Sequence, residues 1–408
     1  MVGCRVGFHP ATGELRAGPG GQAGPQFCWA DRVAGLVRDK FSELFQGTTY
    51  YKRKVLAGVV VERAGEASVV SLTTGTKCIN GAQLSLAGLA LNDCHAEVLA
   101  RRGLVCWLYG QLERALAGQD SAVGPDRERG GFSLLPGTSL HLFISTAPCG
   151  DARIYSPAEQ SGRVPRPEPP PGESSNRGKL RSKIESGMGT VPLGGVEQLQ
   201  TWDGVTAGER LLTMACSDKI LLWNWVGLGG ALLAHWLPPL HLDTITLGSR
   251  FHPEHVQRAL WGRGQAAGLE RSVRQPALLA TTSPEPRQAS KAQDHSLNWV
   301  AGGRAEVVMG ATGRTQAGHP SRLCKRALAD RFAGLCALPG AVGQARSSLA
   351  PLVGSYHIDC GWRYGELKKL AVEHEAGKRE LVAALGRAGA GQWVGKPGEQ
   401  DQFTVAGL

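Results

Sequence analysis

Residues 91–104 read LNDCHAEVLARRGL and bring metal-binding and charged side chains into one short segment. His95 and Glu97 form a His-x-Glu step, and Arg101 and Arg102 follow about one helical turn later. One interpretation is a surface helix that carries charges. The other is a metal site in which the histidine binds the ion and the glutamate moves protons. The rest of the sequence has to distinguish them.

Helical and strand patterns alternate around this segment. Apolar spacing predicts helices over 30–45 and 93–115, whereas valine-rich runs predict a strand pair over 54–62 and 68–77. The run LHLFIST, 140–146, predicts a buried strand that ends just before a Pro-Cys step.

The C-terminal half continues this alternation. Residues 296–314 have the composition of a β-hairpin, and residues 322–335 and 364–386 have helical spacing. Strands alternating with helices favour an α/β fold. We therefore expect one large α/β domain over 28–408, preceded by a flexible Gly/Pro-rich leader, 1–27, and interrupted by a Pro-rich loop at 157–179.

Composition indicates the class of binding partner and the redox state of the cysteines. The 408 residues carry a formal net charge of +10 with a pI of about 9.2, which favours a polyanionic partner, nucleic acid first. The ten cysteines form no C-x-x-C pair and are expected to be mostly reduced, as in a cytosolic or nuclear protein. The first residues lack the apolar core of a signal peptide.

One apolar segment, ILLWNWVGLGGALLAHWL at 220–237, is long enough to be considered as a membrane span. It contains Asn224 and His235 and ends in Pro238-Pro239, so we interpret it as a helix buried in the core.

The zinc deaminases of nucleobases carry an H-x-E…P-C-x-x-C signature, in which the glutamate moves protons without binding the metal. His95 and Glu97 supply its first half, and Pro148-Cys149 follow 54 residues after His95. Position 152 is Ala, so the second thiolate has to come from elsewhere. Cys216, 67 residues after Cys149, is the best candidate. Three protein ligands would leave the fourth zinc position open for water.

Each part of this pattern is common by itself, and Cys216 could equally be a core thiol. The combination favours a metal site because every candidate lies where a strand or turn meets a helix.

Longer motifs add a family resemblance. NDCHAEVLARR, STAPCGDARI, KIESGMGT, QTWDGV, GERLLTMACSDKI, SRLCK and WVGKPGEQDQF together resemble the deaminase domain of adenosine deaminases acting on double-stranded RNA. The resemblance runs from about residue 28 to the end and is closest to the branch of the second and third vertebrate enzymes. The tRNA adenosine deaminases of the position-37 type share the zinc motifs, but TTGTKCING, KIESG and QTWDG are typical of the double-stranded-RNA branch.

The resemblance implies a cytidine-deaminase-like domain with a mixed sheet flanked by helices and a zinc site at helix N-termini. It implies zinc ligation by His95, Cys149 and Cys216 and proton transfer by Glu97. The implied activity is RNA editing, the hydrolysis of adenosine to inosine in double-stranded RNA by base flipping, as part of mRNA processing. The implied location is the nucleus, nucleolar or nucleoplasmic, with the cytoplasm also allowed, and a homodimer is compatible.

A buried inositol hexakisphosphate is also implied, for which Arg and Lys are suitable donors. Matching positions are Asn92, Arg101, Arg102, Lys219, Trp223, Lys325, Tyr364, Lys368, Lys378, Trp393, Lys396 and Asp401. A relay between zinc and this cofactor is implied at Asp93 and Lys183. The basic residues could instead solvate a surface, but their interleaving with apolar residues in LARRGLVCWL and RLCKRAL argues against that interpretation.

Contacts with RNA are implied at a further set of positions. These are Val55, Thr76, Lys77 and Arg153 near the flipped base, and Arg177, Ser186, Thr190, Arg210 and Lys291 along the backbone or groove. Such contacts read A-form shape more than sequence.

The chain departs from the family at four side chains. Met188 replaces a glutamate in the loop that fills the space of the flipped base, and Leu222 replaces an arginine near the inositol phosphate. His374 replaces a tyrosine and Gly395 a glutamate around the same ligand. No double-stranded-RNA-binding domain precedes the deaminase motifs, as expected for a fragment or isoform, or for a deaminase domain that supplies the affinity alone.

These observations favour a zinc-dependent adenosine deaminase acting on double-stranded RNA. A weak or inactive RNA-binding pseudoenzyme that competes for editing sites is the first alternative, supported by Met188 and Leu222. A tRNA adenosine deaminase is the second.

Overall fold

An eight-stranded mixed sheet forms the centre of the computed structural model, which describes residues 28–155, 176–183, 189–193, 211–269, 273–285, 293–346 and 361–405. The strand order is β12-β11-β10-β2-β1-β5-β8-β9. The pairs β5·β8 and β8·β9 are parallel, and the other five pairs are antiparallel. The strands are β1 (Leu56–Arg63), β2 (Glu66–Thr74), β5 (Thr138–Thr146), β8 (Thr244–Ser249), β9 (Ala277–Ala280), β10 (His295–Val300), β11 (Glu306–Met309) and β12 (Arg314–Thr315).

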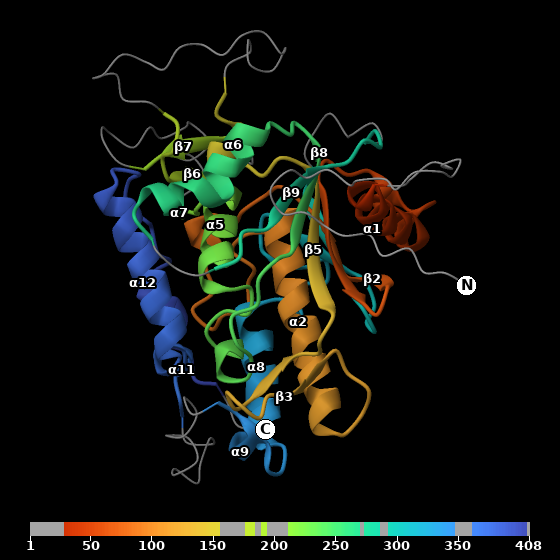
Figure 1. Cartoon of the computed structure of the whole chain (residues 1–408), viewed down its shortest axis with the longest axis vertical. Helices are drawn as coiled ribbons and strands as arrows, with labels where there is room; N and C mark the ends of the chain where they lie inside the picture. Colours follow the sequence, from red (N-terminus) through yellow and green to blue (C-terminus); the bar gives the residue numbers. More distant parts are fainter. Residues whose placement is uncertain are drawn as a thin grey trace, which may run out of the picture.

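The central strands of the sheet are buried on both faces, with α1 and α2 on opposite sides (Figure 1). Successive side chains of a strand point to opposite faces of the sheet, so each strand can pack against both layers. Along β1, Leu56 and Val60 pack with α1 (Trp29–Phe45), whereas Ala57 and Val59 pack with α2 (Ala96–Leu116). The expected strand pair and both expected helices are present, and the mixed α/β sheet is confirmed.

Further helices cover the α2 side of the sheet. They are α5 (Cys216–Val226), α6 (Pro253–Gln257), α7 (Arg263–Ala266), α8 (Lys325–Ala337), α9 (Ala341–Gln344), α11 (Tyr364–Leu370) and α12 (Val372–Arg387), with a π-helical turn over Arg258–Gly262 between α6 and α7. Two short hairpins complete the fold: β3 (Val123–Pro125) with β4 (Phe132–Leu134), and β6 (Arg181–Lys183) with β7 (Thr190–Pro192).

Two expected helices differ from the structure. The segment 220–237 is largely buried, but its α-helix ends at Val226, because Gly227 takes φ +95°, and only a short 3₁₀ helix, η4 (Leu233–His235), follows. The segment 364–386 is divided at Ala371, whose ψ of 64° separates α11 from α12. Within the described ranges no helix has both the length and the apolar character needed to span a bilayer. The leader, 1–27, and most of the Pro-rich loop lie outside the described residues.

Candidate zinc centre and basic core

The N-terminus of α2 carries two of the expected site residues. His95 is the N-cap residue in extended conformation, and Glu97 lies in the first turn. The backbone N–H of His95 donates to Asp93 Oδ1 at 3.1 Å, and that of Ala96 donates to the carbonyl of Gly75 at 3.0 Å. These bonds satisfy donors at the helix start and hold the His95 and Glu97 side chains in the interior, where they are 8% and 3% exposed.

The two cysteines lie on turns that touch each other. Cys149 follows β5, and Cys216 is the first residue of α5. The Ser217 N–H donates to the Cys149 carbonyl at 3.0 Å, and the Cys216 N–H points to Cys149 Sγ at 3.4 Å. Gly150 allows this approach, because it has φ +106° and any Cβ there would lie 2.3 Å from Ser217 Oγ.

The structure brings His95, Cys149 and Cys216 together, with their ligand atoms all within 4.8 Å of one another. One imidazole and two thiolates form a donor set typical of tetrahedral zinc, whose bonds are about 2.0–2.3 Å long. The residues present therefore fit the expected ion.

The pKa values of the two thiols are shifted in opposite directions. A hydrogen bond from Cys216 holds the pKa of Cys149 well below its usual value, helped by the charge of Lys183. Burial raises the pKa of Cys216, and the nearby charges of Cys149 and Glu97 raise it further. A cation bound between them would favour both thiolates.

Asp93 orients the histidine and links it to two lysines. Its carboxylate lies 2.8 Å from His95 Nδ1 and 2.6 Å from Lys183 Nζ, and it also pairs with Lys219. Burial alone would raise the pKa of Asp93, but Lys183 and Lys219 outweigh it and lower that pKa well below the usual value. A carboxylate behind a metal-binding histidine fixes the orientation of its ring. The expected relay pair thus lies beside the candidate zinc centre.

Cys78 was not singled out from the sequence, although it belongs to the TTGTKCING motif. Its Sγ lies 3.4 Å from Asp93 Oδ1 and 3.7 Å from His95 Nδ1, so these three groups form a second set with metal-ligand spacing. Since Asp93 is already paired with two ammonium groups, a cation there would be repelled. The eight cysteines in the described part of the chain are free thiols.

Most of the residues expected around an inositol phosphate form a basic core next to Asp93. Lys325 and Lys368 both pair with Asp401 at 2.6 Å and lie 5.4 and 5.6 Å from the Tyr364 ring centroid. Arg101 lies over the Trp223 ring. We use the name basic core for the cations Arg101, Arg102, Lys183, Lys219, Lys325, Lys368 and Lys396 with the carboxylates Asp93 and Asp401.

The basic core carries more positive than negative charge. Burial, and then repulsion by Lys219, lower the pKa of Lys396 from 10.5 to about 7. Burial likewise lowers the pKa of Arg101 to about 10, with Arg102 as the next cause. Uncompensated buried cations are costly, so this set of donors fits a polyanion.

Three other expected cofactor positions differ in their surroundings. Asn92 bonds to Gln400 at 2.8 Å, while Lys378 is half-buried on α12. Trp393 packs against an apolar cluster that also contains Leu222, one of the departures from the family. Leu222 therefore adds apolar packing where the family places an arginine.

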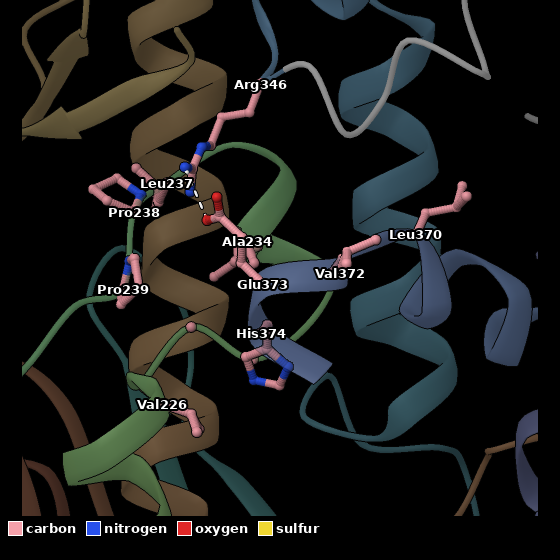
Figure 2. Close-up of a pocket in the computed structure, with 14 residues that line it drawn as sticks. Val226, Ala234, Leu237, Pro238, Pro239, Arg346, Leu370, Val372, Glu373 and His374 are labelled. Atoms are coloured by element: carbon pink, nitrogen blue, oxygen red, sulfur yellow. Dashed lines mark hydrogen bonds and ion pairs between the residues drawn. The ribbon is translucent and has the colours of Figure 1, made fainter. Parts of the chain in front are cut away.

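A separate pocket of about 270 Å³ lies between the 226–239 loop and the start of α12 (Figure 2). His374 lines it, and an ion pair of 3.3 Å between Arg346 and Glu373 crosses its edge. Apart from His374, a departure from the family near the expected ligand, its lining includes none of the positions matched to the inositol phosphate site.

The expected RNA contacts are only partly described. Val55 is buried just before β1; Thr76 and Lys77 follow β2, where Lys77 pairs with Asp294. Arg153 donates to the carbonyl of Ala147 at 2.7 Å. Arg177 is half-buried just before β6, and Thr190 Oγ1 accepts a bond from Arg181 Nε at 2.8 Å. Ser186, Met188, Arg210 and Lys291 lie outside the described residues.

Comparison with known proteins identifies the family of the chain. Residues 71–397 match the model of the adenosine-deaminase (editase) domain. The chain is 42% identical over 396 residues to the double-stranded RNA-specific editase Adar of Drosophila melanogaster, covering 92% of this chain and 55% of that protein. It is 40% identical over 399 residues to the double-stranded RNA-specific editase B2 of Rattus norvegicus (93% and 51%) and 36% identical over 398 residues to the double-stranded RNA-specific adenosine deaminase of Mus musculus (92% and 32%).

The chain thus spans about half the length, or less, of these curated relatives. The tRNA-specific adenosine deaminase 1 of Drosophila melanogaster matches 49% of this chain, a shorter part than the editases match.

Proposed function

The chain belongs to the adenosine-deaminase (editase) domain family, and on that premise we propose that it converts adenosine to inosine in double-stranded RNA with the help of zinc. The observation that carries the proposal is the convergence of His95, Cys149 and Cys216 beside the buried Glu97. When bound, zinc would supply Lewis-acid activation of water.

The chain's own residues would do the following work. Asp93 holds the His95 ring from the side of Nδ1. Glu97 takes the two protons of the attacking water in turn and delivers one to N1 of the purine and the other to the departing amino nitrogen. The water oxygen becomes the C6 carbonyl, the C6–N bond breaks, and ammonia leaves. Burial of Glu97 keeps its carboxylate away from bulk water, so that the proton stays within the site.

We also propose that the basic core holds inositol hexakisphosphate. Its cations include Lys183 and Lys219, which both contact Asp93. A polyanion in this core would therefore influence the group that orients His95. The excess of buried positive charge supports this proposal, as does the pKa of Lys396, which burial and repulsion by Lys219 lower to about 7.

The substrate and the surroundings of the reaction belong to the same proposal. Adenosine in a duplex has to be flipped out of the stack before its C6 can be reached, and Met188 stands in the sequence where the family fills the vacated space. A net charge of +10 favours attraction to RNA. We place the activity in the nucleus, in mRNA processing.

The test is incubation of the purified chain with a fully paired RNA duplex, followed by sequencing for inosine. A Glu97→Gln variant serves as the inactive control. Inosine with the native chain but not with the control supports the proposal. Inosine only in a tRNA substrate would favour the tRNA deaminase, whereas duplex binding without inosine would favour the pseudoenzyme, the alternative suggested by Met188.

A further inference from the structure

The two cysteine turns come from distant parts of the chain. In a C-x-x-C motif, three peptide bonds keep the thiolates at a fixed spacing. Here 67 residues separate Cys149 from Cys216, so non-covalent contacts have to supply the spacing. Each turn carries an aspartate two positions after its cysteine, Asp151 and Asp218, and both carboxylates are completely buried.

Asp151 is held mainly by Arg258. Arg258 Nε donates to Asp151 Oδ2 at 2.9 Å, and Nη2 donates to the Asp151 carbonyl at 2.9 Å. The Gly178 N–H adds a third short bond to Asp151 Oδ1 at 2.7 Å. The side chain and the backbone of this turn are thus fixed by the same guanidinium.

Asp218 is held mainly by Arg263. Arg263 Nη2 lies 2.7 Å from Asp218 Oδ1, and the Arg181 N–H donates to Asp218 Oδ2 at 2.9 Å. Arg263 Nε also lies 3.8 Å from Asp151 Oδ2. One guanidinium therefore contacts the carboxylates of both cysteine turns.

The π-helical segment explains how one short stretch of helix supplies an arginine to each of the two cysteine turns. Arg258 and Arg263 are five positions apart, and in a regular α-helix such positions point about 140° apart around the axis. The π-helical turn over Arg258–Gly262 adds a residue to the turn and brings the two arginines toward one side. Single π-helical turns occur often at functional sites.

We propose that Asp151, Asp218, Arg258 and Arg263 form a positioning network that holds the Cys149 and Cys216 turns at the spacing that the metal requires. The inference rests on the proposed function, because it concerns the same metal site. None of the four side chains would bind the metal. Each acts through a cysteine turn, as outer groups do around metal ligands generally.

Zinc release tests the network. The zinc-loaded full chain is mixed with excess chromogenic chelator well below its unfolding temperature, and the release rate is measured for Asp151→Asn and Asp218→Asn. Both changes keep the side-chain shape and weaken the ion pairs. We expect release about ten- to hundred-fold faster than in the native chain, the usual effect of losing an outer partner of a metal site.

Glu113→Gln is the matched control. Glu113 forms a double ion pair with Arg331, at 3.0 and 2.6 Å, but lies about 24 Å along α2 from Glu97. Its substitution should leave zinc release unchanged. A second readout is the rise in thermal midpoint on zinc binding. The network predicts that this rise shrinks in the aspartate variants, whereas a purely structural role would lower the midpoints with and without zinc equally.

If the aspartate variants fail to fold, zinc release from Arg258→Lys tests the network instead. It keeps the charge of a side chain that is 24% exposed but loses the double contact to Asp151. Native release rates in Arg258→Lys, or in both aspartate variants, would overturn the inference while leaving the proposed function intact. A native chain that retains no zinc would overturn the zinc part of the proposed function and this inference together.

Discussion

Glu97 lies in the first turn of α2, 3% exposed and close enough to Cys216 for its charge to raise the pKa of that thiol. It is not part of the His95, Cys149 and Cys216 cluster. At the scale of the residue, this arrangement separates the proposed metal ligands from the proposed proton carrier.

The separation gives the first prediction. Glu97→Gln should retain stoichiometric zinc but slow deamination by at least about a hundred-fold, because a general acid–base group contributes about 10²–10⁴ to the rate. Cys216→Ala should lose zinc, since two protein ligands hold the ion much less firmly than three. Elemental analysis of the purified variants measures the metal, and inosine formation measures the rate. Stoichiometric zinc in Cys216→Ala would show that another group is the third ligand.

Met188 gives the second prediction. A flipped adenosine leaves an orphaned partner base, to which a glutamate could hydrogen-bond, whereas methionine offers packing and a weak thioether acceptor. Met188→Glu should therefore speed editing of fully paired adenosines by roughly five- to thirty-fold, the equivalent of about 1–2 kcal/mol of hydrogen bonding. Editing of a mismatched adenosine should gain less, because its flipping costs less.

Rates on matched and mismatched duplexes that rise by the same factor would contradict that role for Met188. A Met188→Leu variant, which keeps the apolar filling, is the control and should behave like the native chain.

Each metal candidate has a local signal in the sequence, and the structure brings the three side chains together. His95 and Glu97 form a known step, Cys149 follows a buried strand, and Cys216 begins a helix. Asp151 and Arg258 had no such signal. They are 107 residues apart, and their pairing becomes visible only when the turn after β5 packs against the π-helical turn.

At the scale of the element, the way each helix starts and ends positions the site. Helix α5 begins at Cys216 and ends where Gly227 takes a conformation suited to glycine. Apolar composition predicted that 220–237 is buried but not where its α-helix stops, since the residues after Gly227 remain apolar while forming loops and a short 3₁₀ helix. Similarly, nothing in the spacing of 364–386 revealed the break between α11 and α12.

Gly150 gives a prediction at this scale. Gly150→Ala should lower zinc content and activity, because the new Cβ would lie 2.3 Å from Ser217 Oγ and 2.6 Å from Ala215 Cβ and push the two cysteine turns apart. Gly65→Ala is the control, because Gly65 also has a positive φ, +85°, but has open space around its Cβ position. Both variants carry backbone strain, and only Gly150→Ala should lose zinc. Equal zinc content in the two would show that the close approach is unimportant.

At the scale of the whole molecule, the sheet and its helices surround a core that is charged as well as apolar. The sequence predicted a polyanionic partner from a net charge of +10, but total charge cannot distinguish a basic surface from a basic interior. The structure places part of this charge inside, where Lys183 is 1% exposed. A polyanion that neutralised this core would stabilise the folded chain.

Lys396 allows the last prediction, which concerns pH. In the folded chain without a polyanion its pKa is about 7, against an ordinary value of 10.5. Between these values the unfolded chain holds a proton that the folded chain does not, so the free energy of unfolding should rise with pH over this window. Below about pH 7 the full penalty of the buried ammonium group remains. Phosphates bound in the core would favour the ammonium form and remove this penalty.

Lys396→Gln should therefore have opposite effects in the two states. In protein made without inositol polyphosphates it should raise the thermal midpoint at neutral pH and flatten the rise toward pH 10. In protein loaded with inositol hexakisphosphate it should lower the midpoint, because a donor to the phosphates is lost. Lys369→Gln, at an exposed position of α11, should change neither curve. A loss of stability in both states would mean that Lys396 supports the fold through its contacts with Leu212 and Thr213, independently of any polyanion.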